Sequence, residues 1–217
     1  MLNKPPRPSR KAAMAHTPTL VTHTIEPLFD SRSRVLMLGT MPSPKSREYG
    51  FYYGHPRNRF WPVMACLWDE PPATTIAEKK ALMLRHRLAV WDVLAGCEIV
   101  GASDASIKRP RPNDLARIID AAPIEAVVTC GSAATRYYER FDAPRWPELP
   151  HLALPSTSPA NARMSLDALV KAYAPVKELT EGGEAAAGVL AALAPTAAAV
   201  SDPEDSAPGV SAPGDAR

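Results

Sequence analysis

Two short polar segments each follow directly on an apolar run that is typical of a buried parallel strand. Residues 39–43 (Gly-Thr-Met-Pro-Ser) follow the run 34–38, and residues 154–159 (Leu-Pro-Ser-Thr-Ser-Pro) follow the run 151–153. In an open α/β sheet, ligands bind just beyond the carboxyl ends of the strands. The two segments are therefore expected to meet at one edge of a sheet and to form a polar cleft, with residues 52–61 as its wall.

The alternation of strand and helix patterns constrains the fold further. Apolar runs of strand length alternate with segments whose apolar residues have helical spacing. This order implies a parallel sheet with helices on both faces. We therefore expect an α/β fold, a single-domain three-layer α/β/α sandwich around a central, mainly parallel four-stranded sheet. The expected strands span residues 34–39, 88–91, 124–130 and 151–154, and the expected helices span 58–67, 76–87, 114–121, 133–141 and 165–173.

Composition divides the 217 residues into a core and two tails. Residues 1–20 are Pro-rich, hold four basic residues and no acidic one, and are expected to be a disordered arm. This arm either attracts DNA weakly through its charge or is an inert extension. Residues 21–177 are expected to form the folded domain. Residues 178–217 are acidic and rich in Ala and Pro, and are expected to be a low-complexity tail, with a short helix over 184–200 as one option.

Composition also limits the compartment and the chemistry. No apolar run reaches ~18 residues, so no membrane span is expected. Three widely spaced cysteines, Cys66, Cys97 and Cys130, favour buried thiols in a reducing, cytoplasmic compartment. Three thiols cannot supply the four ligands of an iron–sulfur cluster, and no other metal-ligand cluster is evident, so no metal or other cofactor is expected. A net charge of +2 is compatible with nucleic acid without indicating it.

The stretch Gly-His-Pro-Arg-Asn-Arg-Phe-Trp at residues 54–61, placed between the two strand-end loops, resembles the uracil-DNA glycosylase superfamily. The resemblance covers roughly residues 35–173 and is strongest to the hypoxanthine-DNA (deoxyinosine) glycosylases and the mismatch-specific uracil/thymine glycosylases. It implies the fold of that superfamily and a monomer acting on DNA that contains deaminated bases. The implied reaction is hydrolysis of the N-glycosidic bond of a flipped-out base, as in base excision repair.

The first strand-end loop departs from most of this superfamily. Asp or Asn usually precedes the proline of that loop, whereas here the residue is Met41, which can neither orient nor deprotonate water. The hypoxanthine branch shares this gap and uses an Asn that corresponds to Asn58. The resemblance thus implies that Asn58 holds water through its carbonyl and donates to a base carbonyl through its NH₂. Asn58 is also well suited to cap the helix that it begins. His55 is the second catalytic candidate, as a donor to a phosphate or to the departing base, or else it packs in the loop.

The remaining candidates form the base pocket and the DNA contact. By resemblance, Tyr53 stacks on the flipped base, while Thr40, Met41 and Asp92 line the pocket; Asp92 alternatively caps a following helix. Phe60 and Trp61 have helical spacing and are expected in the core. The hydroxyls of the two loops suit phosphate oxygens, and one residue of the second loop is expected to fill the gap left by the base. The candidates for the phosphate contact are Ser43, Ser156 and Ser158. The candidates for filling the gap are Pro159, Asn161 and Arg163.

Three other functions stay open at this point. A mismatch-type glycosylase acting on uracil opposite guanine is the nearest, with Met41 and Leu154 against it, since other branches have His or Asn at the latter position. A catalytically inactive nucleic-acid-binding module of the same fold is the second. A serine hydrolase using Ser156 is the third, but the chain lacks a Gly-x-Ser-x-Gly elbow. No lysine stands at a motif position, so neither a Schiff base nor strand cleavage is expected.

Overall fold

Four parallel strands form the central sheet of the computed structural model, which describes residues 18–194. They are β2 (Val35–Gly39), β3 (Leu88–Asp92), β6 (Ala126–Cys130) and β7 (His151–Leu154), in the order β3-β2-β6-β7. Every residue of β2, β3 and β6 is buried, which is why these strands are almost entirely apolar, with Thr129 and the final Asp92 as the polar exceptions. The expected sheet is confirmed.

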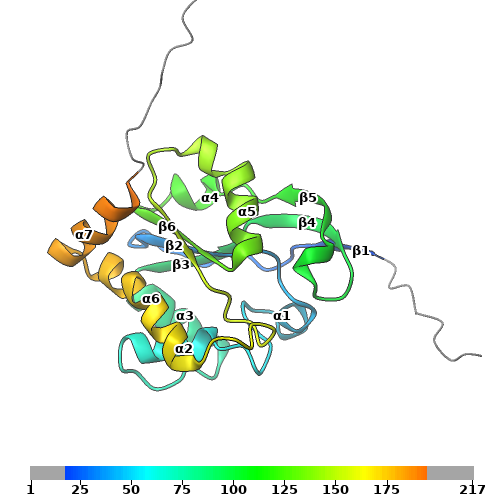
Figure 1. Ribbon diagram of the computed structural model, residues 1–217, viewed down its shortest axis with the longest axis horizontal. Coiled ribbons are helices and arrows are strands. Elements are labelled where there is room, and N and C mark those ends of the chain that lie inside the picture. Colours follow the sequence, from blue (N-terminus) through cyan, green and yellow to red (C-terminus); the bar gives the residue numbers. More distant parts are fainter. Residues whose placement is uncertain (1–17, 195–217) are drawn as a thin grey trace, which may run out of the picture.

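Helices cover both faces of this sheet, so the expected three-layer α/β/α arrangement is also confirmed (Figure 1). One face carries α2 (Phe60–Leu67), α3 (Ile76–Arg85) and α6 (Leu166–Glu181), and the other carries α4 (Ala116–Ile119) and α5 (Ser132–Phe141). The predicted position of Phe60 and Trp61 in the core is correct, since their exposed fractions are 0% and 5%. The helix expected over 114–121 is shorter, a single turn between two bends.

A second, antiparallel sheet was not expected from the sequence. It has the order β1-β4-β5, with β1 at Thr19–Thr22, β4 at Leu94–Ile99 and β5 at Lys108–Pro112. Residues 100–113 carry no apolar run that would indicate a strand. They nevertheless hold the short 3₁₀ helix η1 (Asp104–Ser106) and β5, whose Lys-Arg-Pro-Arg-Pro sequence is tolerated because β5 is an edge strand.

Helices and strands extend beyond residues 21–177 at both ends. Thr19 and Leu20 belong to β1 rather than to an arm, and α6 continues past residue 177 to Glu181. Pro175 removes one backbone hydrogen bond inside α6. The helix continues beyond it because the side chains of Val176 and Leu179 extend the buried apolar face of α6. A further helix, α7 (Gly183–Leu193), follows. The rest of the expected arm and tail lies outside the described residues.

The strand register brings the carboxyl ends of the central sheet together. Gly39 is level with Asp92 in the β2–β3 pair, and Cys130 is level with Leu154 in the β6–β7 pair. The loops that follow β2 and β7 therefore leave the sheet at the same edge, as the sequence predicts. The first of them enters α1 (Pro44–Tyr49), a short helix where only a loop was expected, and η2 (Ala143–Arg145) follows α5.

Candidate active site

A cavity of about 480 Å³ opens at the carboxyl edge of the central sheet. This volume lies within the range of about 300–1,000 Å³ that is usual for small-molecule sites. Ten of the twelve residues expected in the site from the sequence line it, and Asn161 and Arg163 do not. The lining consists of Gly39, Thr40, Met41, Pro42, Ser43, Tyr52, Tyr53, His55, Arg57, Asn58, Asp92, Ala102, Asp104, Cys130, Ser156, Thr157, Ser158, Pro159 and Ala160.

Asn58 joins the two halves of the cavity. Its Oδ1 accepts a hydrogen bond from the backbone N–H of Phe60 at 2.9 Å and another from the hydroxyl of Thr157 at 2.9 Å. The first bond supports the start of α2, but the N-cap of that helix is Arg59, so Asn58 acts from one position before the cap and does not begin the helix as expected. The second ties residues 52–61 to the loop after β7. Both bonds require an oxygen acceptor, which fixes the orientation of the amide and turns its NH₂ away from them.

Arg59 determines the path of the loop that follows β7. Its guanidinium donates to the backbone carbonyls of Ser158 at 2.9 Å, Asn161 at 2.8 Å and Thr157 at 3.4 Å, and also to that of Met164. All of these acceptors are main-chain carbonyls. Arg59 was not among the residues expected in the site. Its position beside Asn58 in the 54–61 stretch is the feature of the sequence that could have identified it.

Tyr53 stands in the cavity wall with one ring face already covered. Its ring stacks on the Phe60 ring with centroids 3.7 Å apart and planes inclined by 9°. The backbone of Tyr53 has φ +51°, an uncommon value for a non-glycine residue, so the surrounding contacts hold it in place. Burial raises the pKa of its hydroxyl well above the usual range, and that hydroxyl has no hydrogen-bond partner among the described residues.

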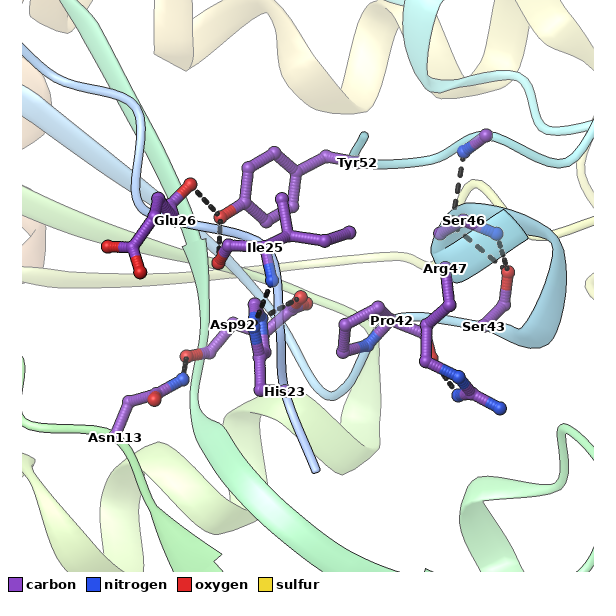
Figure 2. A network of polar contacts seen from close by, with 11 residues as sticks. His23, Ile25, Glu26, Pro42, Ser43, Ser46, Arg47, Tyr52, Asp92 and Asn113 are labelled. Carbon is purple, nitrogen blue, oxygen red and sulfur yellow. Dashed lines mark hydrogen bonds and ion pairs between the residues drawn. The ribbon is translucent and has the colours of Figure 1, made fainter. Parts of the chain in front are cut away.

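Asp92 forms part of the cavity floor and does not cap a helix, because strand β4 follows it. Its Oδ2 lies 2.9 Å from Nε2 of His23, and the side-chain amide of Asn113 donates to its backbone carbonyl at 2.8 Å (Figure 2). A methyl group on Gly39 would come within 2.3 Å of Asp92 Oδ1. The carboxylate can occupy this position only because residue 39 is a glycine and has no side chain.

His23 was not among the residues expected in the site. Besides its contact with Asp92, it is held by a hydrogen bond to the segment that follows it. Its Nδ1 accepts the backbone N–H of Ile25 at 3.2 Å, so in the neutral ring Nε2 carries the proton that points to Asp92. The hydroxyl of Tyr52 donates to the carbonyls of Ile25 at 3.2 Å and Glu26 at 2.8 Å. Figure 2 shows this segment lying between the tyrosine ring and the carboxylate.

Asp104 brings a second carboxylate to the cavity from η1. The hydroxyl of Thr40 donates to its Oδ2 at 3.0 Å. Burial raises the pKa of Asp104 above its usual value, Thr40 opposes this shift, and the charge of Asp92 adds to it. Asp104 was not among the residues expected in the site, because nothing in the local sequence indicates that this loop folds back over the first strand end.

The expected phosphate ligands are held by local turns. Ser43 Oγ caps α1 through the N–H of Ser46 at 3.1 Å, and this small network, with the Arg47 guanidinium on the carbonyl of Pro42, appears on the right of Figure 2. Ser156 and Ser158 each accept a backbone N–H two residues ahead, at 3.2 Å. Their hydroxyl hydrogens are therefore left to donate.

His55 and the three candidates for filling the base gap differ in their contacts and in their positions relative to the cavity. His55 Nδ1 accepts the N–H of Arg57 at 3.1 Å, which leaves Nε2 as the donor in the neutral ring. Asn161 donates to the carbonyl of Ser156 at 2.9 Å, so its side chain braces the loop. Pro159 lines the cavity, while Arg163 is exposed outside it.

The three cysteines do not share one environment. Cys97 and Cys130 are buried as expected, but Cys66 is exposed, because it lies on the outward side of α2, away from the buried Phe60 and Met64. Within residues 18–194, no three His, Cys, Asp or Glu side chains gather closely enough to hold a metal ion. None of the helices between these limits is both long and apolar enough to cross a bilayer.

Comparison with known proteins gives one family. The sequence model of the uracil DNA glycosylase superfamily matches residues 26–179. A protein of Methanosarcina acetivorans named hypoxanthine DNA glycosylase is 30% identical over 139 residues, which are 64% of this chain and 87% of that protein. A protein of the same name from Methanosarcina barkeri is 27% identical over 114 residues, 52% of this chain and 72% of its own length.

Structural comparison supports the same fold. The solution NMR structure of a protein from Methanosarcina acetivorans, assigned as a uracil DNA glycosylase, matches with a TM-score of 0.62 at 24% identity. The match covers 73% of this chain and 99% of that structure. The family match spans the central sheet, both strand-end loops and the Asn58 segment. This chain belongs to the uracil DNA glycosylase superfamily.

Proposed function

We propose that this protein is a monofunctional DNA glycosylase that removes hypoxanthine, the deaminated form of adenine, from deoxyinosine in DNA. The observation that carries the proposal is the fixed amide of Asn58 in a cavity closed by Tyr53 and the loop after β7. The two relatives named hypoxanthine DNA glycosylase support the same substrate.

The locked amide supplies a physical reason for selecting a deaminated base. Because the oxygen of Asn58 is held by Phe60 and Thr157, only its NH₂ is available to a ligand. Adenine presents an amino donor at position 6, whereas hypoxanthine has a carbonyl acceptor there. Because the amide of Asn58 cannot rotate to present its oxygen, it can hydrogen-bond the carbonyl of hypoxanthine but not the amino group of adenine. The unpaired amino group weakens binding of the undamaged base.

The other wall residues fit the steps that base removal requires. Flipping the nucleotide out of the helix costs a few kcal/mol, and stacking on an aromatic ring returns about 1–3 kcal/mol. Tyr53 is backed by Phe60, so its second face is the natural surface for the base. His55 Nε2 and the hydroxyls of Ser156 and Ser158 are donors suited to the flanking phosphates.

The proposal includes hydrolysis without strand cleavage. A glycosylase that also cuts the strand uses an amine nucleophile to form a Schiff base. The described residues that line the cavity include no lysine. We therefore propose water as the nucleophile and an intact abasic site as the product.

The test is base release from end-labelled duplexes that carry one hypoxanthine, uracil, xanthine, thymine or adenine opposite each normal base. Alkali reveals abasic sites, and omission of alkali reveals strand cleavage by the protein itself. We expect hypoxanthine to be released fastest and adenine not at all, with intact strands when alkali is omitted. Release mainly of uracil opposite guanine contradicts the assignment and favours a mismatch-type enzyme. Binding to DNA without release of any base favours an inactive module.

A further inference from the structure

Hydrolysis requires a group that accepts a hydrogen bond, and then a proton, from the attacking water. Asn58 cannot be this group in the arrangement described above. A carbonyl oxygen has two lone pairs, and those of Asn58 Oδ1 are used by Phe60 and Thr157. Asn58 thus provides the donor half of the role expected from the sequence, and the acceptor must be sought elsewhere in the cavity.

The neutral polar side chains of the cavity do not supply it. The hydroxyls of Thr40, Ser156 and Ser158 can still accept a hydrogen bond, but a neutral hydroxyl is far too weak a base to take the proton of the attacking water. His55 accepts a backbone N–H through Nδ1, so its remaining nitrogen carries a proton. Met41 has only a weakly accepting thioether. Two carboxylates, those of Asp92 and Asp104, remain.

The contacts of the two carboxylates separate their roles. Asp92 is 5% exposed, has one oxygen occupied by His23, and has its other oxygen pressed against the backbone of Gly39. Asp104 is half-buried, and among the described residues only Thr40 donates to it, through Oδ2. Its Oδ1 is therefore left for a molecule in the cavity. Because burial raises the pKa of Asp104, its carboxylate is also a better base than an exposed one.

We propose that Asp104 is a catalytic residue that orients the attacking water and takes its proton. This role rests on the proposed function. The water oxygen forms a bond to C1′ of the sugar as the C1′–N9 bond breaks, and the electron pair of that bond leaves with the base. The water proton passes to Asp104, solvent returns a proton to the base, and Asp104 then releases its own proton to solvent. The hydroxyl of Thr40 holds the carboxylate in place throughout.

Several charged and titratable groups surround Asp104 and enter its pH dependence. Asp92 at the end of β3 opposes its ionisation, and Arg136 on α5 favours it. Cys97 on β4 lies close enough for Asp104 to raise the pKa of its thiol, after the larger effect of burial. His55 lines the same cavity. Comparison of two proteins that differ only at residue 104 removes these shared contributions.

The test is Asp104→Asn under single-turnover conditions, with enzyme in excess over a hypoxanthine duplex and with the rate followed from pH 5 to 9. The amide oxygen of Asn retains an acceptor for Thr40, so the loop contact is preserved. Asp120→Asn is the matched control, because Asp120 is exposed at the end of α4 and outside the cavity, and the substitution changes the net charge by the same amount. Affinity for the duplex and the melting temperature are measured for all three proteins.

We expect Asp104→Asn to lower the rate about 10²- to 10⁴-fold, the usual contribution of a general base. We expect unchanged melting, affinity no weaker than that of the wild type, and loss of the fall in rate that the wild type shows as the pH is lowered. A rate within about 3-fold of the wild type contradicts the proposal, as does a slower rate with the same pH profile. If the wild type itself releases no base, the proposed function is wrong and the role of Asp104 falls with it.

Discussion

His23 and Asp92 lie 2.9 Å apart through Nε2 and Oδ2, although 69 residues separate them in the sequence. The histidine belongs to the segment that leaves β1, before the start of the family match at residue 26. The aspartate ends the strand next to the first loop. The N-terminal segment therefore supports the cavity floor from behind.

We predict that His23→Ala lowers the free energy of unfolding by about 1–3 kcal/mol, because a buried carboxylate loses its hydrogen-bond donor. Base release falls as well, since Asp92 forms part of the floor. Urea unfolding followed by fluorescence measures the first effect. His23→Gln is the control because its amide NH₂ can replace the lost donor. Equal stability of the Ala and Gln variants contradicts the role given to this pair.

Asn58→Asp is predicted to abolish most activity without disturbing the fold. The carboxylate still accepts the N–H of Phe60 and the hydroxyl of Thr157, but it has no NH₂ to donate. We expect the excision of hypoxanthine to slow by about 10²-fold or more, as for the loss of an oriented donor. Thermal melting should match the wild type. Asn58→Ala should additionally lose about 1 kcal/mol of stability, because the start of α2 loses its acceptor.

Tyr53 is predicted to act through its ring and not through its hydroxyl. The hydroxyl is buried without a partner among the described residues, so Tyr53→Phe should retain activity and lose no stability. Tyr53→Ala removes the stacking surface and should weaken binding of the flipped base by about 1–3 kcal/mol. Fluorescence of 2-aminopurine placed beside hypoxanthine reports flipping directly. Equal flipping by the Phe and Ala variants rules out the stacking role.

Arg59→Lys is predicted to loosen the loop after β7. A lysine has one compact ammonium and cannot reach the four carbonyls that the guanidinium holds. We expect faster proteolysis within residues 157–164 and a loss of base release of up to about 10²-fold, the effect of a small displacement of positioning groups. Arg140→Lys, at an exposed arginine of α5 outside the cavity, is the control. Unaltered cleavage by protease in the Arg59 variant contradicts this view of the loop.

The stability of the protein is predicted to fall as the pH rises from about 4 to about 7, in part because of Asp142. Its carboxyl is fully buried, neither oxygen accepts a hydrogen bond from a described residue, and burial raises its pKa to about 7. In this window the unfolded chain releases a proton that the folded chain keeps, so unfolding is favoured by up to about 1.4 kcal/mol per pH unit. Above the window the penalty is constant, and below it the penalty vanishes.

Asp142→Asn should therefore be more stable than the wild type at pH 8 and similar to it at pH 4. Urea unfolding of both proteins at each pH measures the difference. The difference isolates Asp142, because His151, whose pKa is lowered by burial and whose effect has the opposite sign, is present in both proteins. A constant difference across the pH range would show that the carboxyl of Asp142 is not protonated in the folded state.

The central sheet is predictable from the sequence because each of its strands can be recognised from a few consecutive residues. Strands buried on both faces are apolar at nearly every position, and the chain must turn after them. The strands β2 and β6 and the loop after β7 are therefore evident in any short window of the sequence. Register then follows from topology, which is why ten of the expected site residues share one cavity.

What the sequence does not reveal depends on pairing between distant segments. His23 gains its role only because β1 pairs with β4, and Asp104 only because η1 returns to Thr40, 64 residues earlier. Arg59 has no acidic partner to suggest its function, since its acceptors are backbone carbonyls that occur in every residue. Likewise β5 is hidden by prolines that an edge strand accepts.

Arg59 binds main-chain carbonyls and not side chains, and this affects which positions of the loop after β7 can be substituted during evolution. Thr157 and Asn161 hold this loop through their side chains and must be kept, but the carbonyls that Arg59 binds are present whatever side chain a residue carries. Exposed positions such as Ala160, Ala162 and Arg163 are thus free to vary without moving the backbone beneath them. New preferences for the partner base or the flanking sequence can arise there by single substitutions, while the chemistry next to Asn58 is left intact.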